Sequence, residues 1–412
     1  MKRLKSIVAV MFIICFFNKT IAYAGEMDIL VEKLVEKGIL TRQDAQEVLD
    51  ETRKEIAEEE QKQKKSSQTP EWVEKIKVKG DFRTRYQWED RETNETRGRA
   101  RIRFRLGSEI QVTENVKVGA GLATGGADPR STNETLDNTF ETPDIRLDYA
   151  YGQYQPVSEM ILKAGKIHKM PFWHPSDFIW DSDINPDGVS LGFNSEVYSK
   201  TDIYFNTACF VLDESSTDTS DPFMYVIQPG IDTCFFDKFM DFKMALTYYG
   251  FYNAAGTTLS YSSGTNTLSN GVLKYNYDSL GVSSEIGFNN IFDSDIVPYI
   301  AVIWDYICNF DPANNKNGFL IGCKIGDEKV KKQKQWQAGY NYRRLERDAF
   351  PDTFPDSDCY SGGTDVKAHE IVFNYGLLDN VILGIDYYYS EPVSRDPDQK
   401  EHLLQTDILL KF

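Results

Sequence analysis

The sequence predicts an all-β fold: a transmembrane antiparallel β-barrel of about sixteen strands, preceded by a short periplasmic α-helical or coiled-coil segment. Three observations lead to it: an N-terminal export signal, many segments of alternating apolar and polar residues, and connections that alternate between short and long. The only long apolar run, residues 6–17, would rise about 18 Å as a helix, short of the roughly 30 Å hydrocarbon core. A membrane-spanning form of this chain therefore has to be a closed barrel.

Residues 1–24 are predicted to be a cleaved signal peptide. Lys2, Arg3 and Lys5 precede the apolar run, and the Ala-Tyr-Ala sequence at 22–24 matches the pattern that signal peptidase cuts. Cleavage would take the net charge from −17 to −21, because the leader carries four basic residues and no acidic one. So acidic a chain lacks the basic footprint of a nucleic-acid-binding protein, and no nucleic-acid partner is expected.

Residues 25–70 are predicted to form a periplasmic helical or coiled-coil segment and a linker. Apolar residues recur with the 3.6-residue period of a helix at Leu30, Val31, Leu34 and Val35, and a second helix is expected over about 41–65. A segment this small cannot bury its apolar stripe alone. We expect it to pair with copies of itself or with peptidoglycan or another periplasmic partner; a solvated tether is the alternative.

Residues 71–412 are predicted to form the barrel, because the sequence period changes from 3.6 to 2. Over residues 76–88 the even positions are mostly apolar and the odd positions are all charged or amide side chains. A wall with lipid on one side and water on the other requires this alternation. About ten residues at 3.3 Å each, tilted near 45°, span roughly 23 Å, which matches the apolar band of an outer-membrane barrel.

Sixteen such segments are expected, with both ends of the barrel on the periplasmic side. The connections alternate between short turns, such as 111–115 and 377–380, and longer loops, such as 168–187 and 346–365, as in bacterial barrels. The predicted strands lie near 75–88, 97–110, 116–123, 144–154, 160–167, 188–193, 198–212, 223–235, 241–250, 272–288, 296–309, 318–326, 335–345, 366–376, 381–390 and 402–412.

Basic residues gather on one face of the first two predicted strands. Residues 97–105 contain five arginines at every second position, which places them in a row on a single face. On a lipid face each would cost roughly 2–4 kcal/mol at the midplane, so the row is expected to line the pore. It forms either a cationic ladder or a charge-paired wall without transport bias. The expected pore-lining residues are Lys77, Lys79, Arg83, Arg85, Arg97, Arg99, Arg101, Arg103 and Arg105.

The loop 168–187 is expected to fold into the barrel and constrict it. Its aromatic residues are too apolar for an external tip in water, and its aspartates could face the arginine row. An external loop packed on itself or on a neighbouring subunit is the alternative. The residues expected to form the constriction are Trp173, Asp177, Trp180, Asp181 and Asp183.

The sequence contains no motif for catalysis, cofactor binding or metal binding. A nucleophile elbow, a zinc signature, a phosphate loop and a dinucleotide fingerprint are all missing. His168 and His174 share one loop but have no fixed frame, so no metal site is predicted there. We expect neither a catalytic residue nor a cofactor, and the chain is not expected to be an enzyme.

Several stretches resemble the putative porins of Gram-negative outer membranes. They are GKIHKMPFW at 165–173, WDSD at 180–183, PDG at 186–188 and the helical opening LVEKGILT at 34–41. The resemblance implies a sixteen-stranded, trimeric diffusion channel in the outer membrane, in contact with its lipid and lipopolysaccharide. The chain also resembles the phosphate-selective porins in size and in its coiled-coil start.

The resemblance and the arginine row together predict a passive pore for small hydrophilic solutes or ions with a weak anion preference. The alternatives are a phosphate- or anion-specific porin, and a barrel without transport activity that serves as an adhesin or structural anchor. An outer-membrane lipase or protease barrel would need a Ser/His/acid set, which the four histidines do not obviously supply.

Overall fold

A computed structural model describes residues 75–412 except 93–94, 215, 217–220 and 396–398, together with isolated positions between 33 and 54. The predicted signal peptide (1–24) lies outside the described residues, as does nearly all of the predicted helical segment and linker (25–70). Among the described residues, no helix combines the length and the apolar character needed to cross a membrane.

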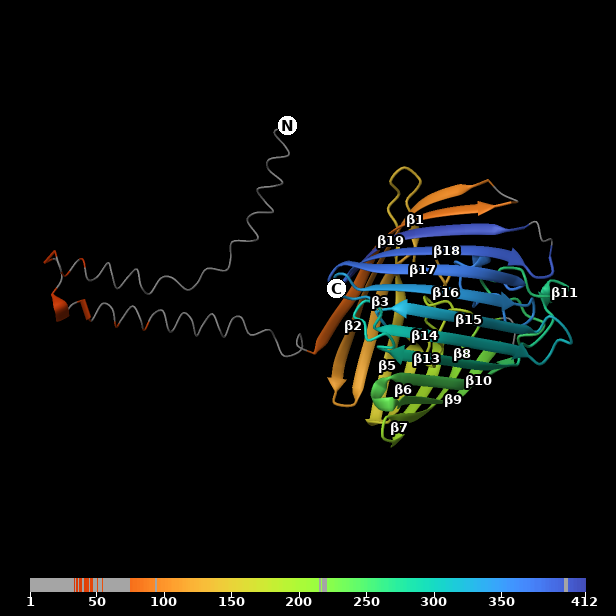
Figure 1. Ribbon diagram of the computed structural model, residues 1–412, viewed down its shortest axis with the longest axis horizontal. Coiled ribbons are helices and arrows are strands. Elements are labelled where there is room, and N and C mark those ends of the chain that lie inside the picture. The colour runs from red at the N-terminus through yellow and green to blue at the C-terminus, as the bar shows by residue number, and fades with distance from the viewer. Residues whose placement is uncertain are drawn as a thin grey trace. The chain divides into compact units, whose positions relative to one another are not determined.

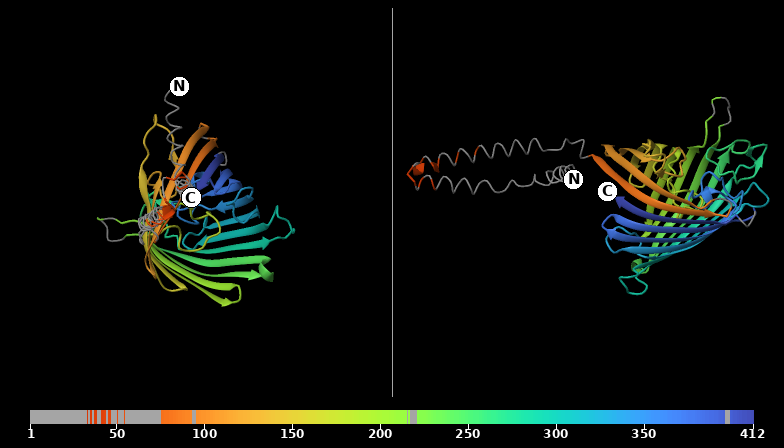
Figure 2. Two further views of the ribbon diagram at one scale, coloured as in Figure 1. Left: turned by 90° about the vertical axis from the view of Figure 1, so that its left-hand side faces the viewer. Right: turned by 90° about the horizontal axis from the view of Figure 1, so that it is seen from above.

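The described chain from residue 75 onward forms one antiparallel sheet that closes on itself (Figures 1 and 2). The sheet has 17 strands; the two-residue strand β4 only extends the pairing of β2 beyond the end of β3, so sixteen strands make the wall. The first strand pairs with the last over Asp81–Arg91, and this pairing closes the barrel. The all-β barrel of sixteen strands that the sequence predicts is therefore confirmed.

The wall strands are β1 (Ile76–Arg91), β2 (Arg97–Thr113), β3 (Val116–Thr124), β5 (Ile145–Val157), β6 (Met160–Lys166), β7 (Asp187–Tyr198), β8 (Thr201–Val211), β9 (Phe223–Phe235), β10 (Met240–Tyr252), β13 (Ser279–Asn289), β14 (Tyr299–Asn309), β15 (Asn317–Gly326), β16 (Trp336–Leu345), β17 (Val366–Leu378), β18 (Val381–Pro392) and β19 (Glu401–Lys411). The remaining elements are β4 (Glu134–Thr135), the small hairpin β11 (Leu268–Ser269) and β12 (Val272–Leu273), and the 3-10 turns η1 (Phe236–Lys238) and η2 (Tyr360–Gly362).

The two largest differences from the predicted strand boundaries lie at the end of β7 and at the start of β13. The turn expected at 194–197 lies instead at 199–200, where Lys200 takes a positive φ of 62° and ends the pairing of β7 with β8. The strand expected over 272–288 begins only at Ser279, because Tyr277 has a φ of 67° and its fully buried side chain belongs to a loop. Alternation alone could not reveal either break.

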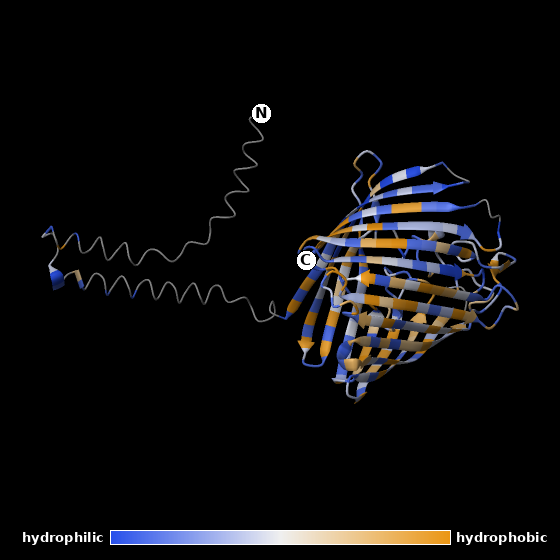
Figure 3. Cartoon of the chain, in the orientation of Figure 1, coloured by the Kyte–Doolittle hydropathy of each residue, from blue (hydrophilic) through white to orange (hydrophobic). Residues whose placement is uncertain are grey.

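The wall has an apolar outer surface and a mixed interior. Apolar side chains point outward, among them Tyr86, Leu246 and Ile321, which are at least 43% exposed, and Figure 3 shows apolar and hydrophilic residues interleaved along the strands. This is the pattern of a barrel that faces lipid. The interior contains charged side chains along β1 and β2, a packed apolar cluster, and a second group of buried charges around Arg343 of β16 and Glu370 of β17.

The apolar cluster fills the interior between three long loops and the inner face of β8–β17. Trp180 from loop 167–186 contacts Phe350 and Phe354 from loop 346–365, with ring centroids 5.3 and 4.7 Å apart. Both Trp180 and Phe350 also contact Tyr249 on β10. Close-packed side chains leave little room for water where this cluster lies.

Candidate functional site

The basic residues of β1 and β2 point into the barrel. Arg85 and Arg103 are 6% and 7% exposed, whereas Tyr86, the next residue to Arg85, is 57% exposed on the outer surface. The buried guanidinium groups contact carboxylates from inward-folded loops and from β19. The two-residue period of the strands therefore places the arginines in a row on the inner face. This is the face expected from the sequence, because an arginine in lipid would be costly.

The strand register brings like charges face to face. Arg83 lies opposite Arg103, and Arg85 lies opposite Arg101, across the β1–β2 ladder. Like charges directly opposite each other destabilise a sheet unless counter-charges compensate them. The compensation here comes from Asp81 on β1, Asp407 on β19, and Asp183 and Asp358 in two loops.

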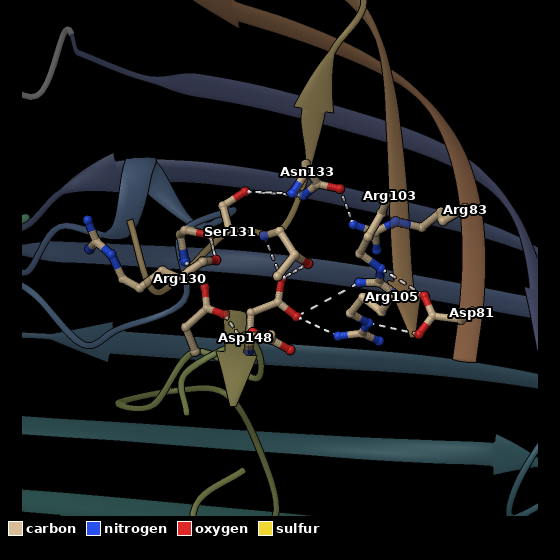
Figure 4. Close-up of polar contacts among 12 residues, drawn as sticks. Asp81, Arg83, Arg103, Arg105, Arg130, Ser131, Asn133 and Asp148 are labelled. Carbon is tan, nitrogen blue, oxygen red and sulfur yellow. Dashed lines mark hydrogen bonds and ion pairs between the residues drawn. The ribbon is translucent and has the colours of Figure 1, made fainter. Parts of the chain in front are cut away.

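The lower part of the row is a network of two arginines and two aspartates (Figure 4). Arg105 donates from Nε to Asp81 at 2.8 Å and from Nη1 to Asp183 at 3.0 Å. Arg103 binds Asp81 at 2.9 Å and lies 3.9 Å from Asp183. Asp183 also accepts hydrogen bonds from the amide and hydroxyl of Thr132, at 3.2 and 2.9 Å. A carboxylate of loop 167–186 is thus held against the wall of β2.

The middle of the row is neutralised from β19 and from loop 346–365. Arg85 makes two parallel hydrogen bonds to Asp407, each 2.8 Å long, and a third of 3.0 Å to Asp358. The bidentate fork is the strongest geometry available to an arginine and a carboxylate. Arg83 lies 3.4 Å from Asp407 and donates to the side-chain oxygen of Asn133.

The upper part of the row is less completely paired. Arg99 binds Glu89 at 2.9 Å, and Arg101 donates to the side-chain oxygen of Gln87 at 3.1 Å. Arg97 is exposed at the external end of β2. Among the described residues no carboxylate forms an ion pair with Arg97 or Arg101.

Basic residues continue along the same wall below the arginines. Lys79 binds Glu109 at 2.8 Å, and Lys77 is exposed one alternation further down. The alternation of β3 and β6 places Lys117 and Lys163 on the inner face beside them, and Lys163 lies 5.6 Å from the ring of Tyr151. The wall from β1 to β6 is therefore mainly basic over its whole height.

Loop 167–186 crosses the barrel, so its residues contact several walls. Arg343 of β16 binds Asp177 at 3.1 Å and Asp356 at 3.0 Å. The amide of Trp173 donates to Gln228 of β9 at 2.9 Å, and the indole lies 5.4 Å from Lys243. Of Asp177, Asp181 and Asp183, the aspartates expected from the sequence to form the constriction, only Asp183 forms ion pairs with the arginines of β2.

Asp181 and Asp183 are neighbours with opposite ionisation behaviour. Burial would raise the pKa of Asp183, but Arg103, Arg105 and Arg83 outweigh burial and hold this pKa below its usual range. Burial, and then the negative charge of Asp183, raise the pKa of Asp181 well above its ordinary value. Asp181 instead accepts backbone hydrogen bonds from Ser357 and Asp183 and so joins the two loops. Asp183 is the member of the pair that carries charge at the wall.

The sequence did not identify Asp81, Asp358, Asp407 or Arg343 as members of the site. Asp81 and Asp407 carry a signal that could have been read, because each is an acidic residue at an inward position of its strand. Asp358 lies in loop 346–365. The sequence marks this loop only as one of the long connections, by its length, and offers no reason to place Asp358 near the arginines.

The region of the row that contacts the loops has a small excess of positive charge. Arg83, Arg85, Arg103 and Arg105 form ion pairs with Asp81, Asp183, Asp358 and Asp407, and Arg101 adds a fifth positive charge that has no ion-pair partner among the described residues. No group of residues in the described part of the chain is arranged to hold a metal ion. Burial lowers the pKa of His168 to about 4, so this imidazole adds no charge to the site near neutral pH.

Comparisons with known proteins agree with the barrel. A family model described as "Putative porin" matches residues 88–281 and 272–412. Pseudomonas putida OprB, in a structure determined at high pH, has a similar fold with a TM-score of 0.54 and 10% identity, over 84% of this chain and 97% of that one. No curated protein matches the chain.

Two further solved structures match over 82% of this chain. The outer-membrane channel DcaP of Acinetobacter baumannii has a TM-score of 0.45 and 11% identity over 97% of its own length. A triple mutant of the Rhodopseudomonas blastica porin has a TM-score of 0.44 and 12% identity over its whole length. Because the family model covers most of the closed barrel, the chain belongs to the putative porin family.

Proposed function

We propose that this chain is a passive outer-membrane channel for small hydrophilic solutes or ions, with a weak preference for anions. The observation that carries the proposal is the inward arginine row of β1 and β2, in which four arginines pair with four carboxylates and Arg101 has no ion-pair partner among the described residues. Membership of the putative porin family and the sixteen-stranded barrel support a channel over an adhesin or an anchor.

The solute path follows the basic wall. The apolar cluster occupies much of the interior next to β8–β10 and β14–β16, whereas the inner faces of β1 and β2 carry the row of arginines. Charges act on a passing ion only within about 8 Å at physiological salt, so the few groups at the narrowest part decide selectivity. Asp183 and Asp358 cancel much of the arginine charge there, and a weak anion preference remains. Loop 167–186 is the constriction, and no chemical step takes place.

The channel is a homotrimer exported through the signal peptide at residues 1–24. Support for the trimer comes from the outer surface of β2 to β6, where small side chains lie side by side: Ser108, Ala120 and Ala150 in one cross-strand row, and Gly152 and Ala164 in the next. Small side chains let two backbones approach closely within a membrane. Lipid and lipopolysaccharide cover the remaining outer surface, and residues 25–70 contact peptidoglycan or another periplasmic partner.

The experiment is a measurement of current through the purified, folded full-length mature protein in planar bilayers. Stepwise single-channel currents support the proposal if their reversal potential in a salt gradient is shifted slightly toward the equilibrium potential of the anion. A folded, inserted protein that gives no current contradicts it and favours the adhesin or anchor.

A further inference from the structure

A pocket of about 210 Å³ opens above the contact between Asp183 and β2. It is large enough for several water molecules or for a small oxyanion. Four arginines line it: Arg91, Arg99, Arg101 and Arg130. So do four carboxylates: Glu89, Asp128, Asp358 and Glu401. The equal numbers suggest neutrality, but the pairing within the pocket is uneven.

Each carboxylate of the pocket is bound by an arginine other than Arg101. Glu89 is 2.9 Å from Arg99, and Asp128 is 3.2 Å from Arg130. Asp358 binds Arg85 at 3.0 Å. Glu401 forms an ion pair with Arg91. Among the described residues, Arg101 is consequently the one charged group of this pocket without an ion-pair partner.

The strand register explains why Arg101 has no partner. Asp407, Arg85 and Arg101 lie in one cross-strand row, with Arg85 in the middle. Arg85 takes both oxygens of Asp407 and one oxygen of Asp358, and neither carboxylate lies within ion-pair distance of Arg101. Arg101 is left with the neutral Gln87 at 3.1 Å, and its Nε is buried without a hydrogen-bond partner.

A half-buried guanidinium with unused donors is costly unless an acceptor reaches it. The acceptor has to enter from the pocket, where Ser131 and Ser361 add hydroxyl groups that can also donate to an oxyanion. The fork of an arginine matches the oxygens of a carboxylate or a phosphate and gives little advantage to chloride. The site therefore favours small oxyanions.

We propose that Arg101 is the residue that determines anion recognition, binding a small carboxylate or phosphate oxyanion in this pocket. The other arginines of the contact region are neutralised by aspartates and act as wall structure. This inference rests on the proposed channel function and assigns its selectivity to one residue instead of the whole row.

The test compares channel block by oxyanions in native protein and in single variants, in planar bilayers with potassium chloride as the electrolyte. Inorganic phosphate and acetate are added separately, and the concentration that halves the chloride current is measured for each. In native protein both should reduce the current, and the more effective one identifies the preferred oxyanion. Arg101→Gln should raise both half-blocking concentrations about tenfold or more, because it removes a charge-assisted hydrogen-bonding group.

Two further variants make the result specific. Arg101→Lys keeps the charge but loses the fork, so its half-blocking concentrations should lie between those of native protein and Arg101→Gln. Arg344→Gln is the matched control, because it removes the same charge outside the pocket, from a residue that lies 3.4 Å from Glu346. The half-blocking concentrations of Arg344→Gln should equal those of native protein. Heat-modifiable migration in gels checks that each barrel is folded.

The outcomes separate this inference from the channel function. Native protein that conducts but is not blocked by either oxyanion overturns the inference and leaves the channel intact. The inference is also overturned if the half-blocking concentrations of Arg101→Gln equal those of native protein, or if Arg344→Gln changes them as much as Arg101→Gln does. Folded native protein without any current overturns the proposed function itself. If Arg101→Gln does not fold, Arg101→Lys is compared with native protein instead. Equal half-blocking concentrations in these two proteins would overturn the inference that the guanidinium group of Arg101 binds the oxyanion.

Discussion

Replacing Asp183 with asparagine should strengthen the anion preference of the channel. The aspartate lies 3.0 Å from Arg105 and 3.9 Å from Arg103, and its loss leaves the positive charge of this wall less compensated. The barrel should still fold, because both arginines keep Asp81 and an asparagine oxygen can still accept from Thr132. The variant therefore changes charge at the constriction with little change of shape.

The size of the effect follows from Coulomb's law. One unit charge about 8 Å from a passing ion contributes about 0.5 kcal/mol in water, and about 0.2 kcal/mol after screening over one Debye length. The change has opposite signs for chloride and potassium, so it counts twice in their permeability ratio. Asp183→Asn should raise the ratio of chloride to potassium permeability about two- to sixfold.

The assay is the reversal potential across a planar bilayer in a potassium chloride gradient. Asp237→Asn is the control, since this aspartate is fully exposed in the turn after β9 and pairs with Lys200. Its permeability ratio should equal that of the native channel. An Asp183→Asn channel with an unchanged ratio would refute the argument that this carboxylate lies at the point that sets selectivity.

Three other predictions follow from the same account. The mature protein should begin at Gly25, and N-terminal sequencing of outer-membrane material that finds residues 1–24 retained would contradict the export signal. A mature form that lacks 27–65 should keep a folded barrel but lose oligomer stability or envelope attachment, as measured by native electrophoresis and fractionation; no change in either would reduce the segment to a tether. Changing Arg99, Arg101 and Arg103 together to Gln should abolish the anion preference and move the reversal potential toward that of the cation, because Asp81 and Asp183 then lack Arg103 as a partner.

The fold was predictable because a barrel wall imposes one repeated constraint. Every strand must alternate between lipid and interior, and every connection must alternate between the two ends of the barrel. The sixteen predicted strands match the sixteen observed ones in order and approximate position. The misplaced boundaries lie where backbone conformation ends a strand although the alternation continues, as at Lys200 and Tyr277.

Apart from Asp183, which was named from its loop, the residues of the site that could be predicted lie on strands. Residues such as Arg99 and Arg103 follow from the two-residue period and the cost of burying arginine in lipid. Their partners depend on contacts between residues distant in sequence, such as Arg85 with Asp407, which the closure of the barrel brings together. The positions of Asp183 and Asp358 depend on how two long loops pack through Trp180 and Phe354, and no local pattern encodes that packing.

The central claim is that ions cross the barrel along the arginine-lined wall of β1 and β2. It is tested most directly by the reversal potential of the native channel in a salt gradient, measured together with the Asp183→Asn variant. The account predicts a weak anion preference in the native channel that increases when Asp183 loses its charge. A clear cation preference in the native channel that the variant leaves unchanged would show that the ions follow another path.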